Sequence, residues 1–387
     1  MSARPVLPGA TLGILGGGQL GRMLGMAARS LGYGVVVWAG NYDAPARVIA
    51  DRVLTQPHGD LEGTIELMRT CDLVTLEWEN MPAETVDVLS EHRPCHPSAS
   101  VLRITQDRLA ERALLDRLGI PTAPAYGVRT AEDLHTAWQK VGLPARVKTA
   151  RGGYDGGGQW RVRTETELGS LPTMDGTTAY RWEKEVNFER EISVLLARSS
   201  TGEVRVYPAF ENEHTGGILH LTRCPARISP EVARRAEEIA RSVAEALQIV
   251  GMLTVECFVV AAPGGGHDVW VNELAPRVHN SGHLTIEASS TSQFEQHIRA
   301  VCGLPLGETT LRSPAAMVNL LGDKSRARVQ LTGVPEALSV PHTHLHLYGK
   351  QEVRARRKLG HVTALAGSPE EAVARAIRAH GALGFEG

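Results

Sequence analysis

The spacing of hydrophobic and polar residues is clearest at the start of the chain. An apolar run, a glycine-rich loop, a segment with helical spacing and a second apolar run follow one another at residues 11–15, 16–21, 23–31 and 35–38. This order is typical of a βαβ unit, in which a helix joins two parallel strands. A further apolar run at 73–76 ends in polar residues, beginning with Glu77. We therefore predict an α/β domain over residues 1–100, closed by a linker at 92–98.

The glycine-rich loop fits the spacing G-x-G-x-x-G through Gly16, Gly18 and Gly21. In dinucleotide-binding proteins this spacing is accompanied by an acidic residue after the second strand, which holds a ribose hydroxyl. Here the second strand ends at Trp38 and is followed by Ala-Gly-Asn, without an acid. The dinucleotide interpretation is therefore disfavoured. Two others stay open: a tight turn between strand and helix, or a helix N-terminus that binds another anion.

A second glycine-rich segment lies in the middle of the chain, after a charged helix predicted at 106–118. Five glycines occupy the seven positions 152–158, and the strand predicted before them at 145–148 carries Lys148. No Gly-Lys-Ser/Thr follows, so this is not a Walker loop. A hairpin of this composition can close its amide groups over phosphates, and a lysine on the preceding strand can pair with them. Together these features favour a nucleotide-binding segment over a merely flexible turn.

Carboxylates inside or beside apolar runs are the next feature. The three residues and their runs are Glu191 in 190–194, Glu256 in 253–260, and Glu273 just after 269–271. A buried glutamate is costly unless its charge is paired or bound to a metal. Glu256 and Glu273 on two neighbouring antiparallel strands, facing the same side, would make a Mg²⁺ site for a nucleotide. The alternative for Glu256 is an ion pair with an arginine. Polar groups at the carboxyl end of the second run also match the place where open α/β sheets bind ligands.

Two further segments complete the outline of the chain. The segment 180–186 is interpreted as a hinge between two lobes, whose backbone N–H and C=O groups can face an adenine edge. From residue 307 onward we predict a third, smaller module, which contains a dense basic cluster at 346–350 and 354–361. Such a cluster is ordinarily a solubilising surface, and a compact phosphate pocket is the sharper alternative. Nothing in its pattern favours nucleic acid, because aromatic residues are not interleaved with the basic ones.

Composition narrows the class of protein. A chain of 387 residues predicts two or three domains, and a formal net charge of −2 gives no general attraction to nucleic acid or acidic membranes. No apolar stretch approaches the length of a membrane span, and the first twenty residues lack the layout of a signal peptide. The five cysteines are widely spaced without a CxxC pair, so neither a disulfide framework nor a zinc site is predicted. We expect a cytoplasmic protein with reduced thiols.

Four sequence blocks carry a resemblance to a known family. They are Gly-Gly-Gly-Gln-Leu-Gly-Arg-Met at 16–23, Tyr-Asp-Gly at 154–156 with Gln159, Asn-Glu-Leu-Ala-Pro-Arg-Val-His-Asn-Ser-Gly-His at 272–283, and Tyr-Gly-Lys at 348–350. In this order, from residue 13 to residue 361, the chain resembles the N5-carboxyaminoimidazole ribonucleotide synthetases, which are ATP-grasp enzymes of purine synthesis. The block at 272–283 is the most specific of the four.

The resemblance implies an ATP-grasp fold that combines α/β and α+β parts. Its domains would be a Rossmann-like pre-ATP-grasp domain at 1–100, an ATP-grasp domain of two lobes at 101–306 with its hinge near 183–186, and a small C-terminal domain at 307–387. The implied reaction carboxylates 5-aminoimidazole ribonucleotide with bicarbonate and ATP, through carboxyphosphate, and releases ADP and phosphate. The implied cofactors are ATP and Mg²⁺, as one or two ions with Mn²⁺ as a substitute. A homodimer is expected, without nucleic-acid or membrane partners.

The resemblance also assigns roles to individual residues. Those implied for ATP are Arg108, Lys148, Tyr154, Gly156, Gly157, Gly158, Gln159, Glu183, Lys184, Glu185, Val186, Glu191, His214, Asn272 and Glu273. The Mg²⁺ ligands would be Glu256 and Glu273. The residues implied in catalysis are Asp155, Arg277, His279 and Asn280. Those implied for bicarbonate or the ribonucleotide are Gln19, Glu77, Tyr154, Asp155, Arg277, Asn280, Ser281, Lys350, Arg357 and Lys358.

Two positions depart from the family pattern. The family usually has a basic residue where this chain has Gly157, and its Gly-Arg-Lys reads Arg356-Arg357-Lys358 here, which leaves open which arginine holds phosphate. His279 would orient bicarbonate or relay a proton, or it is a hydrogen-bonded structural histidine. The rival functions are an NAD-dependent oxidoreductase, a non-catalytic nucleotide-binding regulator, and a formate-dependent glycinamide ribonucleotide transformylase or another ATP-grasp ligase.

Overall fold

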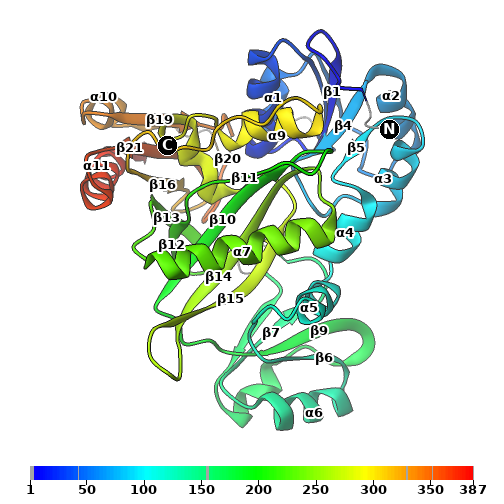
Figure 1. The fold of residues 1–387 in the computed structure, drawn as a ribbon, viewed down its shortest axis with the longest axis vertical. Helices are drawn as coiled ribbons and strands as arrows, with labels where there is room; N and C mark the ends of the chain where they lie inside the picture. The colour runs from blue at the N-terminus through cyan, green and yellow to red at the C-terminus, as the bar shows by residue number, and fades with distance from the viewer. Residues whose placement is uncertain (1–3, 42, 154–156, 328–329, 351, 387) are drawn as a thin grey trace.

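The computed structural model describes residues 4–41, 43–153, 157–327, 330–350 and 352–386. It is an elongated molecule in which the N-terminal domain and a small β-lobe lie at opposite ends of a large central sheet (Figure 1). The C-terminal strands continue the same central sheet (Figure 1). The second and third of the predicted parts therefore share one sheet.

The N-terminal domain is a parallel sheet with the strand order β3-β2-β1-β4-β5. Its strands are β1 (Thr11–Leu15), β2 (Gly34–Trp38), β3 (Arg52–Leu54), β4 (Leu73–Leu76) and β5 (Cys95–His96). Its helices are α1 (Gln19–Ser30), η1 (Pro45–Ile49), α2 (Leu61–Thr70), α3 (Ala83–Ser90) and α4 (Ala99–Thr105). The parallel α/β unit predicted from the sequence is confirmed. The predicted linker at 92–98 is partly wrong, because Cys95 and His96 pair with β4 as a short edge strand.

The small lobe is an antiparallel sheet with the order β6-β9-β7-β8. Its elements are β6 (Ala125–Thr130), α6 (Ala131–Val141), β7 (Ala145–Thr149), β8 (Gln159–Val162), η2 (Glu165–Ser170) and β9 (Asp175–Lys184), preceded by α5 (Arg108–Arg117). A capping box between Thr130 and Asp133 fixes the start of α6. The Asp107 side chain accepts hydrogen bonds from the N–H groups of Leu109 and Ala110, so α5 begins two residues later than the sequence predicts.

The central sheet has nine strands, with the order β15-β14-β10-β12-β13-β16-β21-β19 and β11 paired to β10. The strands of its first half are β10 (Arg190–Arg198), β11 (Val204–Val206), β12 (Phe210–Thr215), β13 (Ile218–Cys224), β14 (Gly251–Ala261) and β15 (His267–Ala275). Helix α7 (Pro230–Leu247) covers one face through buried side chains that include Val232, Ile239 and Val243. Helix α9 (Gln293–Val301) packs between α1 and strands β10 and β14, and so joins this sheet to the N-terminal domain.

The C-terminal segment adds β16 (Ala315–Leu321), β21 (Lys358–Leu365) and β19 (Thr343–Leu347) to the edge of the central sheet. It is therefore not a separately folded unit at the level of its main sheet. Two short helices, η3 (Asn280–Leu284) and α8 (Thr285–Ala288), precede this segment. The other elements of the segment are β17 (Arg326–Ala327), β18 (Gln330–Thr332), α10 (Val334–Leu338), β20 (Glu352–Val353), α11 (Pro369–Ala382) and β22 (Gly384–Glu386). Helix α11 packs on β16 and β21 through Ala372 and Ala376.

Strand β15 is longer than the sequence predicts and continues to Ala275. Asn272 and Glu273 therefore lie inside a strand, not beyond its end. The sheet around them is antiparallel, so the rule that ligands bind at the carboxyl ends of parallel strands does not explain this site. What places Glu273 is the pairing of β15 with β14, in which Glu273 stands opposite Glu256.

The glycine-rich loop of the N-terminal domain holds an anion that belongs to the protein itself. The carboxylate of Glu77 accepts hydrogen bonds from the N–H groups of Gly18, at 2.8 Å, and Gly21, at 3.0 Å. Burial raises the pKa of Glu77, and the two amide donors partly oppose that shift. The dinucleotide interpretation is excluded by this arrangement, because Glu77 stands where a pyrophosphate would approach the amides. The anion-binding interpretation is correct, with a side chain as the anion.

We expect Gly16→Ala to destabilise the fold more than Gly9→Ala. Both glycines have positive φ, +106° and +95°, but a Cβ at Gly16 would lie 2.5 Å from Glu77 Cγ, whereas a Cβ at Gly9 meets nothing within 4 Å. The left-handed backbone costs about 1–2 kcal/mol in each variant, and crowding adds about 1–3 kcal/mol at Gly16 alone. Urea unfolding of the two variants measures the difference. Equal losses would show that Glu77 does not crowd the loop.

Candidate functional site

Two partly buried carboxylates face each other at the centre of the molecule. Glu256 on β14 and Glu273 on β15 are directly paired across the two antiparallel strands. Burial, and then the charge of Glu256, raise the pKa of Glu273. Burial also favours the neutral acid of Glu256, but its interactions with His279, His214 and Arg277 outweigh burial and lower its pKa to about 2. Two carboxylates in this arrangement create a strong local demand for positive charge.

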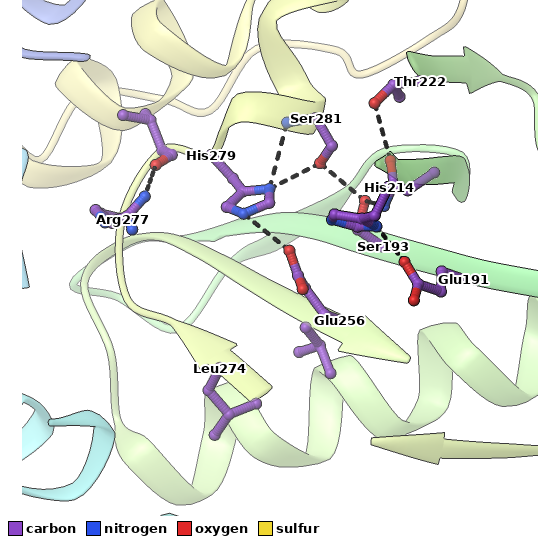
Figure 2. A network of polar contacts seen from close by, with 12 residues as sticks. Glu191, Ser193, His214, Thr222, Glu256, Leu274, Arg277, His279 and Ser281 are labelled. Atoms are coloured by element: carbon purple, nitrogen blue, oxygen red, sulfur yellow. Dashed lines mark hydrogen bonds and ion pairs between the residues drawn. The ribbon is translucent and has the colours of Figure 1, made fainter. Parts of the chain in front are cut away.

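His279 is the nearest partner of this carboxylate pair. Its Nε2 lies 2.9 Å from Glu256 Oε1, and its Nδ1 lies 2.9 Å from Ser281 Oγ. The ring thus stands between Glu256 and the η3 turn, as Figure 2 shows. The backbone of His279 is held by Gln293, whose side chain accepts from His279 N–H and donates to His279 C=O. The alternative that Glu256 pairs with an arginine is not what the structure shows, because its direct partner is a histidine.

Arg277 ties the N-terminal domain to this centre. Its guanidinium makes a two-point ion pair with Glu79, in which Nη2 lies 2.7 Å from Oε1 and Nε contacts Oε2. Burial would lower the pKa of Arg277, but the charge and hydrogen bonds of Glu79 raise it. Burial would likewise raise the pKa of Glu79, and Arg277 lowers it instead. The sequence analysis counted Glu79 among the polar residues that follow the run at 73–76 but assigned it no role.

Next to Arg277 and His279, Asn280 has a buried side chain. Neither its Oδ1 nor its Nδ2 has a hydrogen-bond partner among the residues that the structure describes. Buried amides are nearly always hydrogen-bonded in proteins, so an unpartnered one calls for an explanation such as a ligand. The hydroxyl of Ser281, by contrast, is engaged with His279 and with Ser193.

A second charged network connects the small lobe to the central sheet. Lys148 on β7 pairs with Glu183 on β9, which also accepts from Arg181 at 2.6 Å. Arg181 reaches Glu111 on α5, and Glu111 accepts from the N–H of Leu274 at 2.9 Å. Burial raises the pKa of Glu111 to about 7, against the attraction of Arg181. Glu111 was not found from the sequence, because only the fold brings α5 beside β9. Arg181 lies two residues from Glu183 on the same strand, and the sequence analysis assigned it no role.

The glycine-rich hairpin between β7 and β8 lies partly outside the described residues, which excludes Tyr154, Asp155 and Gly156 from the account of the site. At its base, Thr149 N–H donates to Gly158 C=O at 2.9 Å. Arg108 donates to the carbonyls of Thr149, at 2.8 Å, and Gly152, at 2.7 Å. Arg108 therefore braces the hairpin base in this structure. Gln159 stands opposite Lys148 in the strand pairing, and Gly157 is exposed.

The end of β9 was predicted to offer backbone groups to an adenine. The N–H groups of Lys184 and Glu185 are already bound, by the carbonyls of Pro124 at 2.8 Å and Pro144 at 3.0 Å. The prediction that these two N–H groups face an adenine is therefore wrong in this structure. Among the described residues, the N–H of Val186 has no hydrogen-bond acceptor. The side chain of Glu185 forms ion pairs with Arg146 and Arg161, which indicates a structural role.

The remaining ATP-implied residues of the central sheet lie near the carboxylate pair. His214 on β12 contacts Glu191 on β10. Burial would lower the pKa of His214, but Glu191, and then Glu256 and Glu273, raise it. Asn272 lines a small cavity between α5 and β15, together with Arg181 and Glu183 among others. The structure thus brings Lys148, Glu183, Glu191, His214, Asn272, Glu256 and Glu273 to the junction of the two lobes.

Lys350 of the C-terminal segment contacts the N-terminal domain. Lys350 Nζ donates to Gln19 Oε1 at 3.0 Å and to the carbonyl of Lys358 at 2.6 Å. Arg22 on α1 donates to the carbonyl of Tyr348 at 3.0 Å, which fastens the same turn. Arg357 donates to the carbonyl of Glu352, and the neighbouring Arg356 contacts that of Gly216. Lys350 and Gln19 are therefore brought together, whereas the two arginines point to different partners.

A strand lysine, a glycine-rich hairpin and paired carboxylates at the junction of two β-lobes define an ATP-dependent ligase of the ATP-grasp class. The matches to family models agree with this class. The chain matches an ATP-grasp domain at 113–294, a ribonucleotide synthetase preATP-grasp domain at 9–106, and a phosphoribosylaminoimidazole carboxylase C-terminal domain at 315–375.

Known relatives narrow the class to one family. The N5-carboxyaminoimidazole ribonucleotide synthase of Bacillus subtilis is 40% identical over 363 residues, which are 94% of this chain and 93% of the relative. A crystal structure of an N5-carboxyaminoimidazole ribonucleotide synthetase in complex with ADP has a TM-score of 0.90, at 40% identity over 98% of both chains. The Aspergillus clavatus enzyme in complex with ADP and 5-aminoimidazole ribonucleotide has a TM-score of 0.83, at 29% identity over 95% of this chain and 96% of that one. The chain belongs to the N5-carboxyaminoimidazole ribonucleotide synthase family.

Two features are absent from the part of the chain that the structure describes. Within those ranges, no helix is long and apolar enough to cross a membrane. No group of three or more histidine, cysteine, aspartate or glutamate side chains in the same ranges is arranged to hold a metal by itself. All five cysteines are free and buried, as expected from their spacing.

We expect Glu79→Gln to lower the free energy of unfolding by about 3 kcal/mol, because it leaves the Arg277 guanidinium buried without its counter-charge. Since Arg277 lowers the pKa of Glu79, the pair stabilises the folded state above the ordinary glutamate pKa of about 4.3. That stabilisation is lost as pH falls through the lowered pKa. Urea unfolding at several pH values should show the gap between wild type and variant closing in acid. A constant gap from neutral pH down to strong acid would contradict the ion-pair account.

Proposed function

We propose that this chain carboxylates 5-aminoimidazole ribonucleotide with bicarbonate at the expense of ATP, through carboxyphosphate, and releases ADP and phosphate. The observation that carries the proposal is the pair Glu256 and Glu273, set opposite each other at the junction of the two lobes. Bicarbonate is a poor electrophile, and transfer of the γ-phosphoryl group of ATP to it creates a leaving group. The amine of the ribonucleotide then attacks the activated carbon, phosphate leaves and the N-carboxylated product forms.

Phosphoryl transfer of this kind needs positioning and charge neutralisation more than a strong nucleophile. We assign Lys148 to the phosphates, since its strand leads into the glycine-rich hairpin and its ammonium group has Glu183 as a counter-charge. We assign the N–H of Val186 to the adenine edge, because the preceding two N–H groups are engaged. Closure of the glycine-rich hairpin would exclude water, from which carboxyphosphate must be protected.

Glu256 and Glu273 are the residues that we assign to Mg²⁺. The pKa of Glu273 is raised by burial and then by the facing charge of Glu256. Such a pair of carboxylates suits a divalent cation, and carboxylate oxygens are the ligands that Mg²⁺ prefers. The bound ion would neutralise charge on the phosphates during transfer.

Bicarbonate and the ribonucleotide are assigned to the other side of the carboxylate pair. Arg277, the N–H of the His279 ring and the unpartnered amide of Asn280 are hydrogen-bond donors beside one another. Lys350 meets Gln19 at the boundary with the N-terminal domain, which supports a role for both in holding the ribonucleotide. We assign its phosphate to Lys350, Arg357 and Lys358, with Glu77 shaping the loop that carries Gln19.

A cytoplasmic location and a homodimer are further parts of the proposal. Five buried free thiols support a reducing compartment. The homodimer is supported by the family resemblance alone, and analytical ultracentrifugation tests it directly.

The proposed function is tested by ADP release in bicarbonate-depleted buffer. We expect turnover only when bicarbonate and 5-aminoimidazole ribonucleotide are both added, with one carboxylated product formed per ADP. Formate in place of bicarbonate, with glycinamide ribonucleotide as acceptor, tests the formate-dependent transformylase. ADP release with formate but not with bicarbonate would overturn the proposal in favour of that enzyme.

Glu256→Gln and Glu273→Gln should each abolish ATP turnover while the protein stays folded. Each change removes one charge of the carboxylate pair and should cost several kcal/mol of transition-state stabilisation. Asp268→Asn on the exposed part of β15 is the matched control, because it removes a carboxylate from the same strand outside the site. Steady-state ADP release with circular dichroism measures both properties. Near-normal turnover of either glutamate variant at ordinary Mg²⁺ concentration would remove the metal assignment.

Lys350→Ala should raise the KM for the ribonucleotide strongly and the KM for ATP little. The reason is that Lys350 lies at the boundary with the N-terminal domain, next to Gln19, and apart from Lys148 and the glycine-rich hairpin. Lys324→Ala, an exposed lysine of the same segment, is the control. Initial rates with each substrate varied in turn decide the point. A selective rise in the KM for ATP would move Lys350 to the nucleotide site.

A further inference from the structure

A chain of buried hydroxyl and amide side chains leads away from His279 across the central sheet. Ser281 Oγ lies 2.9 Å from His279 Nδ1 and 2.8 Å from Ser193 Oγ. Asn212 Nδ2 lies 3.0 Å from Ser193 Oγ, and Asn212 Oδ1 lies 2.9 Å from Thr222 Oγ1. Figure 2 shows these contacts leading from the ring of His279 towards Thr222. The sequence analysis gave no role to Ser193, Asn212 or Thr222, and it assigned Ser281 to the substrates.

Strand pairing sets up this chain. Ser193 stands opposite Glu256 across β10 and β14, and Asn212 stands opposite Thr222 across β12 and β13. These side chains therefore form a polar band across one face of the sheet, beneath the η3 turn that carries Ser281. Ser193, Thr222 and Ser281 are fully buried and Asn212 is 5% exposed. Such a band is costly unless each hydrogen bond is made, which is the case here.

One donor that cannot reverse fixes the direction of every hydrogen bond in the chain. The backbone N–H of Ser281 donates to His279 Nδ1 at 3.3 Å, and a backbone N–H is never an acceptor. His279 Nδ1 therefore carries no proton, and the Ser281 hydroxyl near it must donate as well. Ser281 Oγ then accepts from the Ser193 hydroxyl.

The same logic continues to the far end of the chain. Since the Ser193 hydroxyl donates to Ser281, Ser193 Oγ accepts from the Asn212 amide, and this fixes Asn212 Oδ1 as the acceptor of the Thr222 hydroxyl. At the other end, the remaining ring proton of His279 is on Nε2, where it points to Glu256. Protonating Nδ1 would set two N–H groups against each other and oppose this whole sequence of donors.

We propose that Ser193, Asn212 and Thr222 are positioning residues that act through Ser281 to hold His279 as the neutral tautomer with its proton on Nε2. His279 then presents an N–H donor to the reaction centre and not a basic nitrogen. The role that follows for His279 rests on the proposed function: the Nε2–H group orients an oxygen of bicarbonate once Glu256 binds a cation. It excludes proton abstraction from the aminoimidazole by His279.

Thr222→Val and Ser193→Ala test the chain at its far and near ends. Each should lower kcat for product formation by about ten- to a hundredfold, the range typical of residues that orient a functional group through another. The KM for ATP should change less than about twofold, because neither side chain is among the residues that we assign to ATP. Thr222→Ser keeps the hydroxyl and should restore most of kcat. Thr363→Val removes an equally buried threonine hydroxyl of the same sheet that has no partner among the described residues, and it is the control.

Nitrogen-15 NMR of the histidine-labelled enzyme reads the tautomer directly, with a His279→Gln variant to assign the signals. We expect an unprotonated Nδ1 and a protonated Nε2 in the wild type, and a loss of this single tautomer in Thr222→Val and Ser193→Ala. A proton on Nδ1 in the wild type would overturn the proposal, as would wild-type kcat in both variants. Equal impairment of Thr222→Val and Thr222→Ser would also overturn it, because packing and not the hydroxyl would then be responsible. If the wild type failed to carboxylate its substrate, the proposed function would fall, while the NMR result would still decide the tautomer.

Discussion

Placing two partly buried carboxylates opposite each other is the constraint on which the rest of the site depends. Glu256 and Glu273 face each other across β14 and β15, so their repulsion must be offset by positive charge or hydrogen-bond donors. The protein supplies part of this through His279, and more remotely through His214 and Arg277. A register shift of one residue in either strand would turn one carboxylate to the opposite face and dismantle the site.

Three parts of the chain meet around this pair, and ion pairs fasten them together. Arg277 joins the central sheet to Glu79 of the N-terminal domain, and the Lys148–Glu183–Arg181–Glu111 network joins it to the small lobe. The glycine-rich loop of the N-terminal domain uses Glu77 as its own anion, which leaves its neighbour Gln19 free to meet Lys350. Apart from Arg181 and Glu183, which share β9, these contacts join separate elements, so the site exists only when the parts are docked.

Local patterns predicted the parallel unit and the apolar runs at or beside Glu256 and Glu273, because period and composition are local properties. The antiparallel pairing of those runs was a hypothesis, and the pairing of β14 with β15 confirms it. Local patterns did not predict the edge strand at Cys95, the extension of β15 to Ala275, or the continuation of the central sheet into β16 and β21. These depend on long-range pairing. For the same reason Glu79, Glu111 and Asn212 were missed: an ordinary polar residue gains its meaning only from the neighbour that the fold gives it. The family resemblance, not spacing, named the substrates.

The most direct test of the central claim is the location of Mn²⁺ by anomalous diffraction, in crystals grown with a non-hydrolysable ATP analogue. The account predicts metal bound by the carboxylates of both Glu256 and Glu273 and by phosphate oxygens of the nucleotide, with His279 Nε2 released from Glu256. Metal held by the phosphates alone, with the bond between His279 and Glu256 intact, would contradict the account.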